Sequence, residues 1–392
     1  MAARSTKLFL RTFSHNLPLA HPKGREPKAK KPAKHPSCHP PKQGKLIRYV
    51  AQLAEGLQND VPDPVQAASL SFPAIAATSA AAPTTLPLAF PLTTPPSPLT
   101  FHRSSKPLTT TDLVSPLWCE IQYSLSLTHH TRPRQTKYTR AGTRIHTSLE
   151  RINTITRPID VWTREDRFAL RLWNCISALA ALRGEGEVRE LEVWGVIEHQ
   201  VVSGKIDFLE VRDNRVLLGD VKTRGREAVR APWARRGVRA QLMVYFMLFR
   251  GLVDGRGEGK RVLTRLGLDP KKEVSEGTVM QVGRTGAWTL EGLWGEMERK
   301  YALLRGDGVE VGGTLRVEYR DQKNGIVREM VEFEFDEREV EGYVKRVLEW
   351  WRGERPPRGV DIEEGVKCLS CEWKNRCEWK RRVVDMGMRD KG

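Results

Sequence analysis

Residues 204–222, GKIDFLEVRDNRVLLGDVK, decide how this chain folds. Two apolar runs flank a polar stretch at 213–214, which is the pattern of a β-hairpin. A turn centred there pairs residues whose numbers sum to 427, so Asp207 faces Asp220 with Cβ atoms about 5 Å apart. Strand alternation puts Lys222 on the same face as Asp220. The hairpin therefore brings two carboxylates and one ammonium group to a single spot.

That arrangement predicts a divalent cation. Opposed carboxylates in an apolar hairpin repel each other unless a cation lies between them. Mg²⁺ or Mn²⁺ is expected, because hard cations prefer carboxylate oxygen and can activate water for attack on a phosphoryl group. Lys222 would position that water or stabilise the charge that develops on phosphate. The alternative is that Asp207 and Asp220 lie at exposed strand ends, where Lys222 neutralises them.

The composition of the whole chain favours a polyanionic partner. Its 392 residues include 65 Lys and Arg against 48 Asp and Glu, a formal net charge of +17 that indicates nucleic acid. No window approaches the roughly 20 apolar residues of a transmembrane helix, so no membrane span is expected. Six cysteines are too few and too unevenly spaced for a secreted disulfide scaffold.

The first hundred residues differ in composition from the rest. Residues 1–25 are basic and rich in Ser and Thr without any Asp or Glu, as in a mitochondrial transit peptide, although a basic tail that holds nucleic acid is the alternative. Residues 64–102 contain no Lys, Arg, Asp or Glu and lack patterned apolar faces. We expect residues 1–105 to be a mitochondrial targeting segment and disordered Pro/Ala-rich linker, and 106–392 to form one folded domain.

Within that domain, apolar periodicity predicts helices, then a strand pair, then more helices, which is a mixed α/β order. The predicted helices are Thr143–Asn153, Thr163–Leu182, Val238–Arg250 and Gly342–Trp351, and the predicted strands lie in Glu192–Val211 and Arg215–Val221.

Three cysteines near the C-terminus have metal-ligand spacing. Cys368, Cys371 and Cys377 form a C-x2-C-x5-C run, which on chemistry alone fits Zn²⁺ or an iron–sulfur cluster. A soft metal needs a fourth ligand, which the spacing of these three cysteines alone does not identify. Cys175 lies in an apolar helix and Cys38 in the predicted linker.

Basic residues directly follow the hairpin. Arg224, Arg226 and Arg239, with Trp233 among them, offer phosphate contacts interleaved with a stacking ring, so we expect them to contact DNA. A solvated basic loop is the alternative.

The hairpin with Asp207 and Asp220-Val221-Lys222 resembles the core of the restriction-endonuclease-like nucleases, the PD-(D/E)xK group. Its RecB-type subset adds a helix with Gln-x-x-x-Tyr, matched by Gln241 and Tyr245. It also adds an upstream histidine on a helix, matched by His146 after Gly142. The resemblance implies that His146 helps Asp207 and Asp220 hold Mg²⁺, and that Gln241 and Tyr245 complete the site. Glu192 looks like the additional acidic ligand of such sites, with Glu198 as its competitor.

A further segment, 111–120 (TDLVSPLWCE), resembles the exonuclease V family, and the likeness extends from Leu108 to about Arg382. This resemblance implies a [4Fe-4S] cluster on Cys119, Cys368, Cys371 and Cys377, clamping the N- and C-terminal parts of a RecB-type α/β core with a mixed central sheet. The domain at 106–392 would then be a nuclease domain.

The resemblance also implies an activity: Mg²⁺-dependent degradation of single-stranded DNA from an end, with a 5′ to 3′ direction expected. We expect a monomer in the mitochondrion, or else the nucleus, acting in DNA replication, repair or maintenance, with a single-strand-binding protein as a candidate partner. Two alternatives stay open: a non-catalytic nucleic-acid-binding protein whose cysteines hold zinc, and an endonuclease or resolvase with the same core.

Overall fold

The computed structural model describes residues 6–13, 97–131, 136–225, 232–306 and 308–382, except for the side chains of 232–234. These residues form a mixed α/β domain around a six-stranded sheet, as the element order predicts. The strands are β1 (Thr6–Phe13), β2 (Leu108–Thr109), β3 (Thr154–Val161), β4 (Glu187–Ile197), β5 (Gln200–Arg212), β6 (Arg215–Arg224), β7 (Thr314–Asp321) and β8 (Val327–Glu334).

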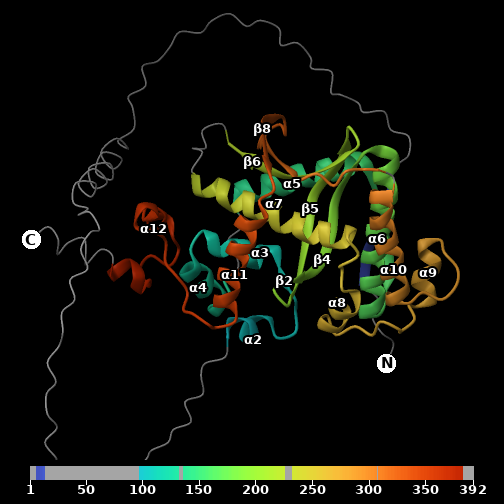
Figure 1. Ribbon diagram of the computed structural model, residues 1–392, viewed down its shortest axis with the longest axis horizontal. Helices are drawn as coiled ribbons and strands as arrows, with labels where there is room; N and C mark the ends of the chain where they lie inside the picture. The colour runs from blue at the N-terminus through green and yellow to red at the C-terminus, as the bar shows by residue number, and fades with distance from the viewer. Residues whose placement is uncertain (1–5, 14–96, 132–135, 226–231, 307, 383–392) are drawn as a thin grey trace, which may run out of the picture.

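The helices surround that sheet (Figure 1). They are α2 (Pro98–Arg103), α3 (Thr110–Val114), α4 (Glu120–Thr128), α5 (Lys137–Asn153), α6 (Arg164–Glu185), α7 (Pro232–Val253), α8 (Gly259–Arg265), α9 (Glu276–Val282), α10 (Leu290–Gly306), α11 (Glu337–Trp351) and α12 (Lys367–Ser370), with short 3-10 turns at Ser115–Leu117 and Ile362–Glu364.

The sheet is mixed in direction. Its order is β2-β5-β6-β7-β8, with β4 paired to β5. β2 runs parallel to β5, and β6 runs parallel to β7, whereas the β4–β5, β5–β6 and β7–β8 pairs are antiparallel. Figure 1 shows α6 and α10 together at one end of the sheet, α7 across it, and α4, α11 and α12 at the other end.

The β5–β6 hairpin has the predicted register. Phe208 lies opposite Gly219, and the following pairs down to the turn keep the sum of 427. Asp213 and Asn214 form the turn with φ values of 48° and 61°. Two left-handed residues are what a two-residue hairpin turn requires, because they match the twist of the flanking strands.

The predicted strand region Glu192–Val211 is a second hairpin. β4 ends at Ile197 and β5 begins at Gln200, with Glu198 and His199 between them at φ values of 47° and 64°. Neither residue is one of the Gly or Asn residues that mark such turns, so the apolar pattern runs through the turn without a break.

Capping defines the longest of the predicted helices. α6 begins where the Thr163 side chain accepts from Asp166 N and the Asp166 carboxylate accepts from Thr163 N, a capping box. The helix ends at Gly186, which has φ of 76°. Its buried face includes Phe168, Leu172 and Leu179, which lie on one side of the helix.

Two described elements lie inside the region that was predicted to be a targeting segment and linker. Thr6–Phe13, expected to belong to a targeting segment, pairs antiparallel with β3 along its whole length, and its Leu10 is buried. Helix α2 also starts at Pro98, inside the predicted linker. The remainder of 1–105, including most of the Pro/Ala-rich stretch, lies outside the described residues. Within the described ranges, no helix is long and apolar enough to cross a membrane.

Candidate active site

Two aspartates face each other where the β5–β6 ladder ends. Asp207 lies directly before Phe208, the residue of the last regular pair, and its Oδ2 accepts a hydrogen bond from Val221 N at 2.8 Å. Asp220 on β6 is completely buried. Its Oδ1 accepts from Lys222 Nζ at 3.0 Å. Its Oδ2 lies 2.8 Å from the same Nζ but accepts no well-formed hydrogen bond from the described residues.

His146 on α5 turns one ring nitrogen toward these carboxylates. Its Nε2 lies 3.1 Å from Val221 O, and because a carbonyl oxygen only accepts, Nε2 carries the hydrogen in that contact. In the neutral ring, Nδ1 then keeps its lone pair. Nδ1 is 3.7 Å from Glu190 Oε1 and 3.8 Å from Asp207 Oδ2. These three side chains are the only His, Cys, Asp or Glu triplet in the described residues with ligand atoms within 4.8 Å of one another.

The acidic residue that meets His146 and Asp207 is Glu190, and not Glu192 as expected from the sequence. The Glu192 carboxylate instead pairs with Arg171 on α6, at 2.7 Å from Nε and 2.6 Å from Nη2. Glu198, its competitor, forms part of the β4–β5 turn. A signal did exist: a turn at 198–199 pairs residues that sum to 397, as in the observed pair of Glu192 with Lys205, and this places Glu190 opposite Asp207.

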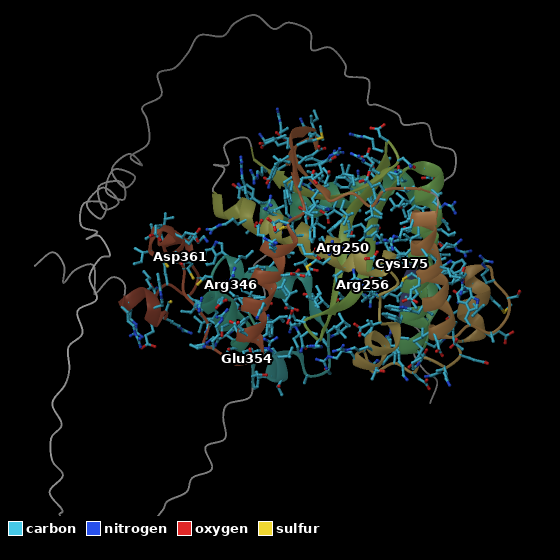
Figure 2. All side chains as sticks on the ribbon, in the orientation of Figure 1. Cys175, Arg250, Arg256, Arg346, Glu354 and Asp361 are labelled. Carbon is cyan, nitrogen blue, oxygen red and sulfur yellow. The ribbon has the colours of Figure 1, made fainter. Side chains whose placement is uncertain are left out.

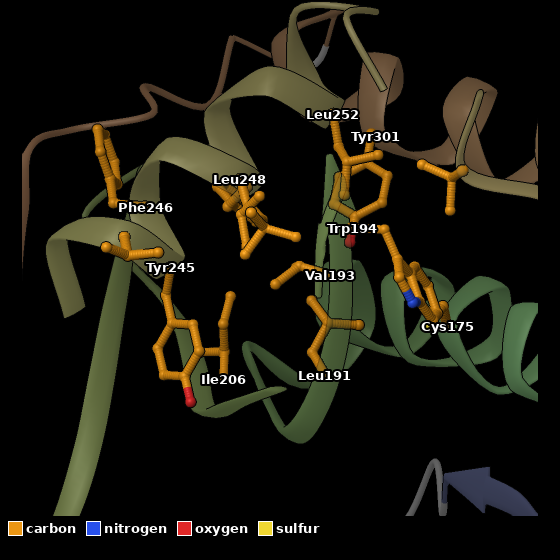
Figure 3. Packing of buried hydrophobic residues seen from close by; sticks show 14 of the residues in the cluster. Cys175, Leu191, Val193, Trp194, Ile206, Tyr245, Phe246, Leu248, Leu252 and Tyr301 are labelled. Carbon is orange, nitrogen blue, oxygen red and sulfur yellow. The ribbon is translucent and has the colours of Figure 1, made fainter. Parts of the chain in front are cut away.

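A chain of hydrogen bonds joins Lys222 to the Gln-x-x-x-Tyr helix. Lys222 Nζ donates to Gln241 Oε1 at 3.2 Å, and Gln241 Nε2 donates to Tyr245 Oη at 3.0 Å. Both residues lie on one face of α7, four positions apart. Figure 3 shows the Tyr245 ring beside Ile206 with its hydroxyl pointing out of the core cluster.

The close approach of the Tyr245 ring explains why residue 204, three positions before Asp207, is a glycine. A Cβ on Gly204 of β5 would lie 2.6 Å from Tyr245 Cε1 and 2.6 Å from Thr110 Oγ1. Only glycine leaves room for the tyrosine here.

Ionisation in the site is strongly perturbed. Burial and the Asp220 charge raise the pKa of Asp207 to about 7. Burial also raises the pKa of Glu190, but hydrogen bonding and charge from His146 and Lys205 outweigh it, and the pKa falls to about 2. The Glu190 carboxylate raises the pKa of His146, against the effect of burial. Perturbed pKa values of this kind are typical of functional sites.

The cationic and phenolic groups keep their protons near neutral pH. Burial lowers the pKa of Lys222, but Asp220 and Asp207 outweigh burial, and the net shift is upward. Burial raises the pKa of Tyr245 to about 12. Lys222 is therefore an ammonium and Tyr245 a neutral hydroxyl.

This donor set fits a hard divalent cation. Carboxylate oxygens with one imidazole suit Mg²⁺ or Mn²⁺. Asp220 Oδ2 is buried with unused hydrogen-bonding capacity, and burial followed by the Asp220 charge raises the pKa of Asp207. A cation between the two carboxylates would stabilise their ionised forms. His146, Glu190, Asp207 and Asp220 are the residues that would hold the ion.

The four expected cysteine ligands lie together, away from the carboxylates, where the start of α4 meets the C-terminal segment. Cys119, at the start of α4, lines one pocket together with Cys368, Cys371 and Cys377. Cys175 does not belong to this group: Figure 2 shows it on the α6 side, far from Asp361 next to the cysteine region. Burial raises its pKa strongly, so it is an inert core thiol. Cys38 lies outside the described residues.

Neighbouring contacts fix this cysteine region. Glu120 accepts two hydrogen bonds from Arg355, at 2.6 Å and 2.7 Å, and a third from Arg358 N at 2.8 Å. Trp373 Nε1 donates to Ser126 Oγ at 3.1 Å. Segments far apart in sequence are thus held side by side.

The residues expected to contact DNA are only partly described. Arg224 ends β6, and its guanidinium stacks 3.7 Å from the ring centre of Tyr319. Arg239 on α7 pairs with Glu339 at 2.9 Å, so part of its charge is already balanced. Arg226 and the side chain of Trp233 lie outside the described residues.

Comparisons with known proteins identify the family of this chain. The family model for exonuclease V, described as a 5′ deoxyribonuclease, matches residues 97–216, 210–287 and 285–380. Exonuclease V of Danio rerio is 31% identical over 281 residues, which is 70% of each protein. A solved protein titled "Crystal structure of SSO0001" covers 70% of this chain and 86% of its own, at 12% identity and a TM-score of 0.30. The match along residues 97–380 and the 31% identity to the Danio rerio protein show that this chain belongs to the exonuclease V family and is a nuclease.

Proposed function

We propose that this chain is a metal-dependent exonuclease that hydrolyses single-stranded DNA from the 5′ end, on a PD-(D/E)xK core of the RecB type. The observation that carries the proposal is the buried Asp220 carboxylate with an oxygen left for a cation, beside the convergent side chains of His146, Glu190 and Asp207. The family model's description as a 5′ deoxyribonuclease supports the direction.

When bound there, Mg²⁺ or Mn²⁺ would polarise the scissile phosphate and activate the attacking water. Asp207 and Asp220 on the hairpin would hold the ion, together with His146 on α5 and Glu190 on β4. Lys222 Nζ is held by Asp220 Oδ1 and Gln241 Oε1. A fixed ammonium at this point positions the water and balances charge that develops on the phosphate.

Tyr245 serves the phosphate as a neutral donor. Its oxygen accepts from Gln241 Nε2, which leaves the hydroxyl hydrogen for a phosphate oxygen. Because its pKa is raised to about 12, the hydroxyl stays protonated throughout the pH range of the reaction. Gln241 thus aligns both Lys222 and Tyr245.

We further propose that Cys119, Cys368, Cys371 and Cys377 hold a [4Fe-4S] cluster that clamps α4 to the C-terminal segment. The four cysteines line one pocket between the start of α4 and the C-terminal segment. Four thiolates can hold either one Zn²⁺ or an iron–sulfur cluster, and the resemblance to the exonuclease V family favours the cluster.

Location in the mitochondrion remains a proposal that rests on the basic, acid-free composition of residues 1–25. We also propose that the protein acts as a monomer on single-stranded DNA, with a single-strand-binding protein as a partner. A fluorescent fusion to the intact N-terminus tests the location, and nuclear fluorescence alone would overturn it.

The experiment for the function is degradation of linear single-stranded DNA, labelled at either end, by anaerobically prepared protein with Mg²⁺. The intact protein should release 5′-terminal products first and leave circular single strands uncut. Asp220→Asn should reduce cleavage at least about a thousandfold, because it removes a metal-binding carboxylate. DNA binding should persist, because asparagine has nearly the same shape as aspartate.

Asp213→Asn is the matched control, since Asp213 is an exposed residue in the turn of the same hairpin and asparagine accepts its left-handed φ. Cleavage of circles would indicate an endonuclease. Binding without cleavage by the intact protein would instead favour the non-catalytic alternative.

A further inference from the structure

The N-terminal strand is built into the domain from both of its edges. On one side β1 pairs with β3 from Thr6 opposite Val161 to Phe13 opposite Thr154. On the other side, the Asn174 amide of α6 donates to Phe9 O at 3.1 Å and accepts from Arg11 N at 3.0 Å. A single asparagine thereby satisfies main-chain groups that an edge strand would leave open.

Side chains of β1 add burial to this pairing. Leu10 is 2% exposed and packs in a cluster with Ile159, Val161 and Leu170. Leu8 packs against the same cluster, whereas Phe9 points outward and is 59% exposed. This is the alternation of a strand with one buried face.

Arg11 connects two elements of the metal site. Its Nη2 lies 2.7 Å from Glu150 Oε1 on α5, one helical turn after His146. Its Nη1 donates to the main-chain oxygen of Glu190 on β4 at 2.9 Å. One guanidinium therefore links the helix that carries His146 to the strand position that carries Glu190.

Glu190 needs such support because its backbone is unusual. Its φ is 57°, and the β4–β5 ladder omits it between the pairs Arg189–Phe208 and Leu191–Ile206. A non-glycine residue in the left-handed region persists only where its surroundings hold it. Here the irregularity accompanies a carboxylate that meets His146 and Lys205.

We propose that Thr6–Phe13 is a permanent strand of this nuclease and that Arg11 is a positioning residue for the metal-facing carboxylate of Glu190. The inference rests on the proposed function for the purpose of the site. It also has a consequence for processing: removal of the first 25 residues would strip β1 from the enzyme, so any import into an organelle must spare it.

The positioning role is tested by titrating Mn²⁺ into the full chain in the absence of DNA, with electron paramagnetic resonance as the measure of binding. Arg11→Met should raise the Mn²⁺ dissociation constant about tenfold, the lower range for residues that orient a metal ligand. Arg11→Lys should restore part of the affinity, because one ammonium cannot make both contacts. Lys7→Met, an exposed change on the same strand, should have no effect.

Unchanged Mn²⁺ affinity in Arg11→Met would overturn the positioning role, and so would intact protein that binds no Mn²⁺. A fall in thermal midpoint without a change in affinity would leave Arg11 purely structural. If the protein binds Mn²⁺ as expected but cuts no DNA, the proposed function fails while this inference stands.

Hydrogen exchange on the intact chain tests the strand separately. The amides of residues 6–13 should be protected to a degree comparable with those of β3. Exchange at the rate of a free peptide would show that β1 is not part of the folded domain.

Discussion

At the proposed metal site, Asp207 is the residue whose protonation state would govern cation binding. Its pKa of about 7 means that the metal-free site holds a proton there in mildly acidic solution. A cation must displace that proton, and His146, whose pKa is also raised, must lose its proton as well. Deprotonation of Asp207 and deprotonation of His146 both favour the bound cation, so the apparent affinity for the cation rises as pH rises.

We therefore predict that the Mn²⁺ dissociation constant is at least about tenfold higher at pH 6 than at pH 8, and that the affinity levels off only once both Asp207 and His146 are deprotonated. Calorimetric titration in two buffers of different ionisation heat measures both the constant and the protons released. Binding that is equally tight at both pH values, with no proton release, would contradict the prediction.

Single residues of the site differ in how far sequence could reach them. Asp207, Asp220 and Lys222 follow from one hairpin register, because a two-residue turn fixes every pair. Glu190 was missed since its turn, at 198–199, carries no Gly or Asn, and since its own left-handed φ is set by contacts with distant residues. Local patterns report local geometry and do not reveal such support.

Among the elements, the β5–β6 hairpin depends on Gly219, which stands directly before the catalytic candidate Asp220. A Cβ at this position would lie 1.8 Å from Cζ of Phe208 on the facing strand. Since the Phe208 ring is buried, it has little room to move.

Gly219→Ala should therefore lower the free energy of unfolding by about 1–3 kcal/mol, the usual cost of overpacking, and reduce nuclease activity by displacing Asp220. Gly237→Ala on α7 is the matched control, because a Cβ there meets no atom within 4 Å and alanine favours a helix. Chemical denaturation compares the two, and equal stability of both variants would count against the tight packing.

Elements were predictable where the pattern is local and strong. The long helix at Thr163–Leu182 has a capping signal and a helical period, and it is confirmed with its end extended to Glu185. β1 was interpreted as a targeting segment because basic and apolar residues in short alternation suit both a transit peptide and a strand. Its partner β3 begins more than a hundred residues later, and no local rule connects them.

At the scale of the whole molecule, the C-terminal segment returns to the beginning of the domain. Trp351 Nε1 donates to Asp112 O at 3.2 Å, and Arg355 binds Glu120. The four cysteines lie at this junction, where Cys119 and Cys368 enclose a loop of about 250 residues. The sequence could pair these cysteines only through family resemblance, because spacing alone does not say which distant thiol completes a set.

If an iron–sulfur cluster closes this junction, Cys119→Ser should remove iron that is otherwise present at about four atoms per chain, and bleach the associated visible absorption. The unfolding midpoint should fall by roughly 5–10 °C, because a ligand bond that closes so long a loop is lost. Cys175→Ala, in the apolar core, should retain the iron despite a small cavity. If the intact protein contains one zinc and no iron, the cysteines hold zinc and the cluster proposal fails. If Cys119→Ser keeps all of its iron, Cys119 is not a ligand.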